Sequence, residues 1–252
     1  MEVSNKKEKI KAAVAISIIL ITIIVAVMVA IIYQIEGEKD LPFVLTKITT
    51  ISTAEGVEIQ ENAEQKWNLD IYQNNDIYFY FEKNKELEDE EEKNNEVIKS
   101  IVIDNIKVTK EPEVGQIKIY MPNSGEGRNF IYSDDLLVQD KLEYRGSTKN
   151  DAKTLQIGNQ GGNLVIRISN TNFTKYISNE NEQVTHDGTI ISKTDIKKEQ
   201  LEFEISLDVT INTKNRSYKS TIKQTLPCGN IIEEGRCSTE NTNQKEFIFK
   251  RK

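Results

Sequence analysis

A pair of cysteines near the carboxyl end is the first candidate for chemistry in this sequence. Cys228 and Cys237 enclose a short segment bounded by Gly229 and Gly235. Outside the cytoplasm such a pair can form a disulfide, which would contribute about 2.7 kcal/mol in the chain-entropy model. Two free thiols are the alternative. A zinc site would need two further ligands, which the single histidine cannot supply, so we expect no metal and no cofactor.

The only histidine is the second candidate. A serine or cysteine nucleophile would have to use His186 as its base, with the neighbouring Asp187 as the orienting group. Neighbours on an extended chain point to opposite faces, however, and Asp-Gly favours a hairpin turn. We therefore expect His186 at a surface turn and predict no catalytic residue. Hydrolysis by two carboxylates stays open, because the sequence has 40 acidic residues and no pattern that selects a pair.

Glycine-rich and acidic segments could bind phosphate or calcium. Gly158, Gly161 and Gly162 lie close together, but a phosphate loop needs a helix after its glycines, and an alternating apolar segment begins here at Leu164 instead. These glycines therefore predict a hairpin turn. The acidic run over residues 86–96 lacks the spacing of a calcium loop, and we interpret it as a solvated segment.

Aromatic residues on a strand and a long loop are the candidate binding elements. The segment DIYFYFEK places Tyr78 and Tyr80 on one face of a strand and apolar side chains on the other. A strand buried on both faces by packing within the domain is the favoured interpretation; the alternative is that the tyrosines are exposed and stack against sugars or a partner protein. In the loop over residues 121–135, which Pro and Gly residues interrupt, the predicted binding residues are Asn123, Arg128 and Tyr132.

An apolar helix is expected to attach this chain to a membrane. Residues 12–35 carry no charge and are long enough to cross a bilayer. The segment is longer than the apolar centre of a cleaved signal peptide, so we predict an uncleaved signal anchor; a long cleaved signal is the alternative. Lysines precede the segment and acidic residues follow it, which predicts a cytoplasmic amino terminus at the cell membrane. The predicted parts are a cytoplasmic segment (1–11), a transmembrane helix (12–33), a juxtamembrane linker (34–43) and an extracytoplasmic domain (44–252).

Period-two alternation dominates the remaining sequence and predicts β-strands. The clearest case is LEFEISLDVTIN, residues 201–212, followed by a polar turn and a second alternating segment. An apolar phase change across Asp104 and Asn105 predicts a β-bulge. Short strands without helical periodicity between them predict an all-β fold, an antiparallel β-sandwich of immunoglobulin-like or related type.

The charge of the chain and the composition of the apolar helix limit the kinds of partner that we expect. Residues 1–35 hold four lysines against two glutamates, so the remainder is more acidic than the whole-chain net charge of −7. Nucleic acids demand clustered Lys and Arg, so we expect no nucleic-acid partner. Ala26 and Ala30 have a spacing that supports close helix association, which makes a homodimer through the membrane helix a candidate.

These expectations combine into one functional hypothesis. We expect a single-pass, membrane-anchored binding or accessory protein of the cell envelope, with an envelope protein or a glycan as its partner. The alternative is a membrane-tethered hydrolase that acts on cell-wall or surface polymers through carboxylates.

Overall fold

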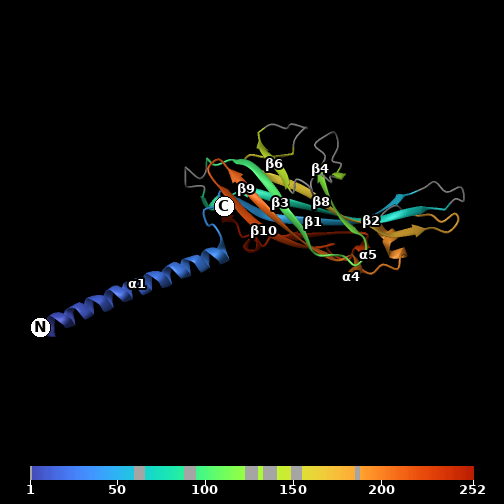
Figure 1. Cartoon of the computed structure of the whole chain (residues 1–252). Coiled ribbons are helices and arrows are strands. Elements are labelled where there is room, and N and C mark those ends of the chain that lie inside the picture. The colour runs from blue at the N-terminus through green and yellow to red at the C-terminus, as the bar shows by residue number, and fades with distance from the viewer. Residues whose placement is uncertain are drawn as a thin grey trace. The chain divides into compact units, whose positions relative to one another are not determined.

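The computed structural model describes residues 2–59, 66–87, 95–122, 130–132, 141–148, 155–184 and 188–252. The chain divides into two compact units, Met1–Lys39 and Asp40–Lys252. The first unit contains helix α1 (Glu2–Glu36), and the second contains the β-strands (Figure 1).

Helix α1 is long and apolar enough to cross a membrane. Its apolar part, Val14–Glu36, has 23 residues, which corresponds to about 35 Å of helix and exceeds the hydrocarbon core of a bilayer, about 30 Å. The helix ends where Gly37 adopts a left-handed conformation (φ 76°) and its N–H donates to the Tyr33 carbonyl at 3.0 Å.

The second unit is all-β, and its strands form two six-stranded sheets, as the alternation predicted. We call the first of them sheet A. Its spatial order is β11 (Arg236–Asn241), β1 (Phe43–Glu58), β2 (Asn68–Lys83), β8 (Gly161–Ile177), β4 (Gln116–Pro122) and β5 (Phe130–Tyr132).

Sheet B is the second layer of the sandwich (Figure 1). Its order is β12 (Lys250–Arg251), β10 (Ser217–Leu226), β9 (Phe203–Thr213), β3 (Ile98–Lys110), β6 (Lys141–Ser147) and β7 (Gln156–Gly158). All neighbours in both sheets are antiparallel except β6 and β7, which are parallel. A sandwich is therefore confirmed, whereas an immunoglobulin-like type stays a prediction.

Short helices connect the strands. They are η1 (Lys85–Leu87), η2 (Gly188–Lys193), α4 (Lys198–Leu201), α5 (Ile231–Glu234) and η3 (Gln244–Glu246).

Several local predictions can be compared with the strands directly. The alternating segment after Leu201 forms β9, and the next alternating segment forms its antiparallel partner β10. The β-bulge is also confirmed: the register of β3 against β9 shifts between Asp104 and Lys107, and Asn105 is left-handed (φ 52°).

The prediction of a Gly-Gly hairpin is wrong, because β7 pairs in sheet B while β8, which begins at Gly161, pairs in sheet A. The turn therefore carries the chain from one sheet to the other.

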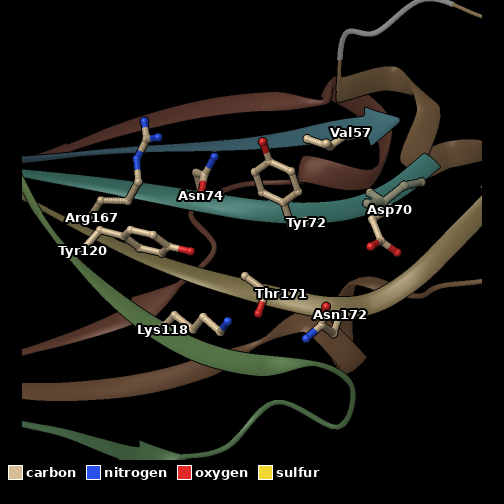
Figure 2. A pocket seen from close by; sticks show the side chains of 10 residues that line it. Val57, Asp70, Tyr72, Asn74, Lys118, Tyr120, Arg167, Thr171 and Asn172 are labelled. Atoms are coloured by element: carbon tan, nitrogen blue, oxygen red, sulfur yellow. The ribbon is translucent and has the colours of Figure 1, made fainter. Parts of the chain in front are cut away.

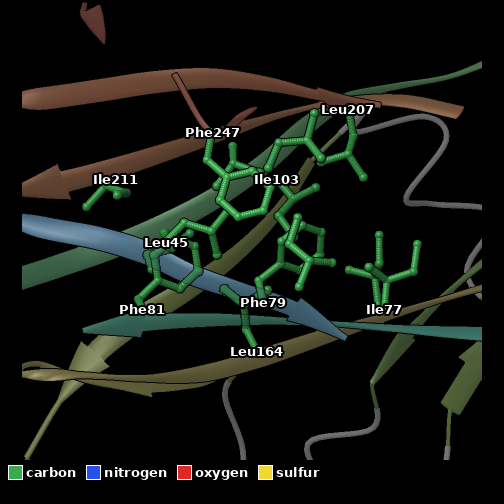
Figure 3. Close-up of a cluster of buried hydrophobic side chains, with 14 of the residues drawn as sticks. Leu45, Ile77, Phe79, Phe81, Ile103, Leu164, Leu207, Ile211 and Phe247 are labelled. Carbon is green, nitrogen blue, oxygen red and sulfur yellow. The ribbon is translucent and has the colours of Figure 1, made fainter. Parts of the chain in front are cut away.

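The core between the sheets consists of two hydrophobic clusters. Figure 3 shows part of the larger cluster, in which side chains of both sheets meet; its labelled members are Leu45, Ile77, Phe79, Phe81, Ile103, Leu164, Leu207, Ile211 and Phe247. The smaller cluster includes Ala54, Leu69, Ile71, Phe173 and Ile190.

Buried polar side chains lie between these clusters along the central strands of sheet A. In β2, for example, Gln73 and Asn75 follow the last member of the smaller cluster and precede Ile77 of the larger one. The Asn75 amide donates to the Ile168 carbonyl at 2.9 Å, and its own oxygen accepts from Ser52 Oγ at 2.7 Å. These hydrogen bonds of Asn75 favour one strand register, because a slip would leave its amide group without these partners.

Candidate binding site

The face of sheet A that points away from sheet B carries a series of tyrosines. In β2 the side chains of Ile77, Phe79 and Phe81 are buried in the core. Tyr78 and Tyr80 alternate with them on the opposite face and are half-buried. Among the described residues, nothing fully covers the rings of Tyr78 and Tyr80, so part of each ring is accessible. We call this surface the outer face of sheet A.

The outer face combines aromatic rings with paired charges. The ammonium group of Lys47 lies 4.6 Å from the centre of the Tyr80 ring and pairs with Glu240 at 2.9 Å. Farther along the face, Arg167 of β8 makes a two-point contact with Asp76 of β2: Nε donates to Oδ1 at 2.6 Å and Nη2 to Oδ2 at 2.8 Å. Such a bidentate pair fixes the orientation of the guanidinium plane.

A pocket of about 420 Å³ opens on this face (Figure 2). Strands β1, β2, β8 and β4 all contribute to its wall. The lining residues are Val57, Asp70, Ile71, Tyr72, Asn74, Lys118, Tyr120, Arg167, Thr171 and Asn172. Figure 2 shows the rings of Tyr72 and Tyr120 together with Lys118 and Thr171 around this space.

A β-bulge in β8 lies at this pocket. Ile71 of β2 pairs with Thr174 and Gln73 pairs with Asn170, so Tyr72 alone opposes the stretch 171–173. Asn172 takes up the extra length in a left-handed conformation (φ 59°), which Asn tolerates better than most residues. Bulges redirect side chains, and this one places the Asn172 side chain at the wall of the pocket.

The two tyrosine hydroxyls at the pocket are held in the neutral form. Burial, together with the adjacent carboxylate of Glu55, raises the pKa of Tyr72 to about 12; its hydroxyl donates to Glu55 Oε2 at 3.1 Å. Burial also raises the pKa of Tyr120, although Arg167 opposes that shift. Both phenols therefore remain hydrogen-bond donors at neutral pH.

The apolar part of this face is concentrated at one end. Outside helix α1, the exposed large hydrophobic side chains of the described residues are Val57 (48% exposed), Ile59 (42%) and Ile177 (65%). Val57 also lines the pocket. The register of β1, β2 and β8 places these three side chains on the outer face, near the same end of the sheet.

The predicted binding residues relate to this pocket in different ways. Tyr78 and Tyr80 share its face but do not line it. Tyr132 pairs with Tyr120 across β4 and β5, although its side chain lies outside the described part of the chain, as do Asn123 and Arg128 altogether. All five remain predictions. Sequence reasoning missed Tyr72, which continues the period-two spacing of Tyr78 and Tyr80 toward the start of β2.

The cysteines belong to the smaller core cluster. Cys228 and Cys237 are buried free thiols in the structure. The Cys228 N–H donates to Ser52 Oγ at 2.9 Å, and Ser52 pairs with Cys237 across β1 and β11. Burial, followed by the influence of Glu234, raises the pKa of Cys237 to about 11, which makes this thiol unreactive at neutral pH. The disulfide stays a prediction.

From the sequence we predicted no catalytic role for His186 and no metal site. His186 and Asp187 lie outside the described ranges. Within those ranges, no group of three or more His, Cys, Asp or Glu side chains is arranged to hold a metal ion.

Comparisons of the chain with protein-family models, with curated proteins and with solved structures gave no match.

Proposed function

We propose that this chain is a single-pass membrane protein whose β-sandwich binds a partner in the cell envelope. Helix α1 is the membrane anchor, and the lysines before its apolar part hold the amino terminus in the cytoplasm. The sandwich then lies on the extracytoplasmic side as an accessory or assembly subunit.

The observation that carries this proposal is the outer face of sheet A. It presents half-buried tyrosines, a pocket of about 420 Å³ and an apolar end on one surface. Tyrosine is enriched at binding surfaces because its ring is apolar and its hydroxyl can form a hydrogen bond. A rigid sheet holds these groups in position at little entropic cost on binding.

The alternative, a carboxylate-dependent hydrolase, gains no specific support from this pocket. Glycoside hydrolysis needs two carboxylates at a fixed separation, one of them free to exchange a proton. Asp76 has both oxygens bonded to Arg167, and Glu55 accepts from Tyr72. The remaining carboxylate of the pocket, that of Asp70, is within 4.0 Å of the Lys175 ammonium group. Each of these three carboxylates therefore already has a hydrogen-bond or ion-pair partner.

Crosslinking in intact cells tests the proposal. A membrane-impermeant crosslinker is applied, and the full-length protein is then purified and its adducts identified. We expect one defined envelope component in a stable ratio. The adduct should disappear when Tyr72→Ala and Tyr120→Ala are combined, and should persist when the exposed Lys223→Ala and Thr225→Ala of sheet B are combined.

Two results would contradict the proposal. If the sandwich does not react with the impermeant reagent, the predicted topology is wrong. If it reacts but yields no adduct, or if both double variants lose the adduct equally, the outer face of sheet A is not the binding surface.

A further inference from the structure

We propose that the pocket on the outer face of sheet A binds a neutral saccharide unit of an envelope glycan. This inference rests on the proposed binding function and names the ligand class of the same site. Aromatic rings, polar groups, charge balance and size each support it.

The aromatic rings match one property of a sugar. Tyr72 of β2 and Tyr120 of β4 lie on the strands that flank β8, and both line the pocket (Figure 2). A pyranose ring has apolar faces made of C–H groups, and an aromatic ring of similar width can cover such a face. The hydroxyls of both tyrosines stay protonated at neutral pH, so neither ring carries a charge.

A buried amide supplies the clearest polar contact. Asn74 lines the pocket but is only 3% exposed. Its Oδ1 accepts from Ser169 Oγ at 2.5 Å, and this bond fixes the orientation of the amide. The N–H₂ group of the same amide is a donor that a ligand hydroxyl in the pocket could accept from.

Further polar groups at the wall are mixed donors and acceptors. Thr171 has a hydroxyl, which donates to the Gln116 carbonyl at 3.2 Å and can still accept. Asn172, which the bulge places at the wall, is exposed and has both an amide N–H₂ and a carbonyl oxygen. Sugar hydroxyls donate and accept, so they can pair with both kinds of group.

The charges around the pocket compensate one another. The Arg167 guanidinium is paired with Asp76, and the two other charged residues of the wall, Lys118 and Asp70, have opposite signs. Glu55 lies behind Tyr72, where it accepts the phenol proton. Asp76 and Asp70 offset the two cations of the wall, Arg167 and Lys118, so the pocket has no surplus of positive charge for an anionic sugar and favours a neutral ligand.

The volume is suited to a small unit. Pockets of about 300–1,000 Å³ are typical of small-molecule sites, and this pocket of about 420 Å³ falls in that range. A protein partner would instead need a contact surface of about 800 Å² on this domain. The described pocket therefore points to one or two sugar units.

Calorimetric titration of the full-length protein in lipid nanodiscs tests the inference. The probes are three neutral disaccharides (maltose, cellobiose and N,N′-diacetylchitobiose) and one acidic sugar, sialyllactose. We expect saturable binding of at least one neutral disaccharide and weaker or no binding of sialyllactose.

Matched variants locate the binding. Tyr72→Ala and Tyr120→Ala should each weaken binding by about tenfold or more, because each removes a stacking surface. Tyr72→Phe keeps the ring and should bind within about threefold of the natural protein. Lys223→Ala, at an exposed position of sheet B, should leave affinity unchanged. Thermal melting of every variant identifies any that fails to fold, and Asn74→Asp then serves as an alternative probe of the same pocket.

The outcomes separate this inference from the proposed function. Absence of saturable binding by any neutral probe, stronger binding of sialyllactose, or an equal loss in Lys223→Ala would overturn the saccharide assignment. If an envelope protein is nevertheless crosslinked through the Tyr72 and Tyr120 surface, the binding function stands with a protein partner. If neither sugar nor crosslinked partner is found, both proposals fail.

Discussion

Each sheet contains a β-bulge with a left-handed asparagine, and the two sites differ in the contacts that this asparagine makes. In sheet B, the side-chain amide of Asn105 (φ 52°) donates to Asp208 Oδ2 at 2.9 Å. In sheet A, Asn172 (φ 59°) is exposed at the wall of the pocket. The same backbone feature thus closes one surface and leaves the other open for a ligand.

We call the site around Asn105 the closed site and the pocket beside Asn172 the open site. In the closed site, both carboxylate oxygens of Asp208 accept hydrogen bonds. Asp208 is buried, and its two oxygens also accept from Lys219 Nζ at 2.8 Å and Thr221 Oγ1 at 2.5 Å. Burial alone would raise the pKa of Asp208, but these bonds outweigh it and hold the pKa below its ordinary value. We infer that this site contributes stability, whereas the open site contributes binding.

The largest expected effect comes from removing the centre of the closed site. Asp208→Ala should lower the free energy of unfolding by about 3 kcal/mol, because Lys219, Thr221 and Asn105 all lose an acceptor. Urea denaturation of the full-length protein followed by Trp67 fluorescence measures it. Binding at the pocket should not change in the folded variant. A loss below about 1 kcal/mol would mean that the network is not a source of stability.

Replacing Arg167 at the open site should lower the free energy of unfolding by a smaller amount. Arg167→Met leaves the Asp76 carboxylate without its bidentate partner and should lower the free energy of unfolding by about 2 kcal/mol. It should also weaken ligand binding, because Arg167 lines the pocket. Urea denaturation and calorimetric titration of the same sample separate these effects. Full binding in Arg167→Met would show that the ligand does not occupy this pocket.

A matched pair of glycine variants compares the bulges directly. Glycine accepts the left-handed backbone at both positions, so only the side-chain contacts differ. Asn105→Gly loses the bond to Asp208 and should cost about 1–2 kcal/mol. Asn172→Gly should stay within about 0.5 kcal/mol. Equal costs, measured by urea denaturation, would show that the two bulges do not differ as described.

The smallest expected effect is a pH dependence of the closed site. The carboxylate of Asp208 is more acidic in the folded than in the unfolded protein, so its stabilising contribution is present above the unfolded pKa and is lost as the pH falls through the folded value. The stability difference between the natural protein and Asp208→Asn should therefore shrink below about pH 4. Urea denaturation at several pH values measures this difference.

An acidic group common to both proteins does not disturb that comparison. Glu182 also has a lowered pKa, about 2, mainly because Lys193 donates to it. It is unchanged in Asp208→Asn, so its contribution cancels in the difference. A difference that stays constant or grows on acidification would contradict the assignment to Asp208.

The sequence predicted the strands and one bulge better than it predicted which strands lie side by side. The β9–β10 pair was predictable because six apolar residues alternate strictly before a polar turn. The bulge at Asn105 was predictable because isoleucines mark the apolar phase on both sides of it. At Asn172 the polar Asn170 interrupts the apolar series, so only Phe173 marks the new phase, and the bulge was missed.

The pocket itself depends on strand order, which local patterns do not contain. Tyr72, Tyr120 and Arg167 belong to three segments far apart in the chain, and they meet because β8 lies between β2 and β4. Alternation indicates which face each side chain occupies but not which strand lies beside it. Tyr78 and Tyr80 were therefore predicted as candidate binding residues, whereas Tyr72, Tyr120 and their convergence at the pocket were missed.

Site-specific photocrosslinking in intact cells tests most directly whether the open site of sheet A is the binding surface. A photoreactive amino acid replaces Val57, which lines the pocket, or Lys223, which is exposed on sheet B. We predict an adduct from position 57 that an added neutral disaccharide suppresses, and none from position 223. Equal adducts at both positions, or an adduct from position 223 alone, would contradict the account.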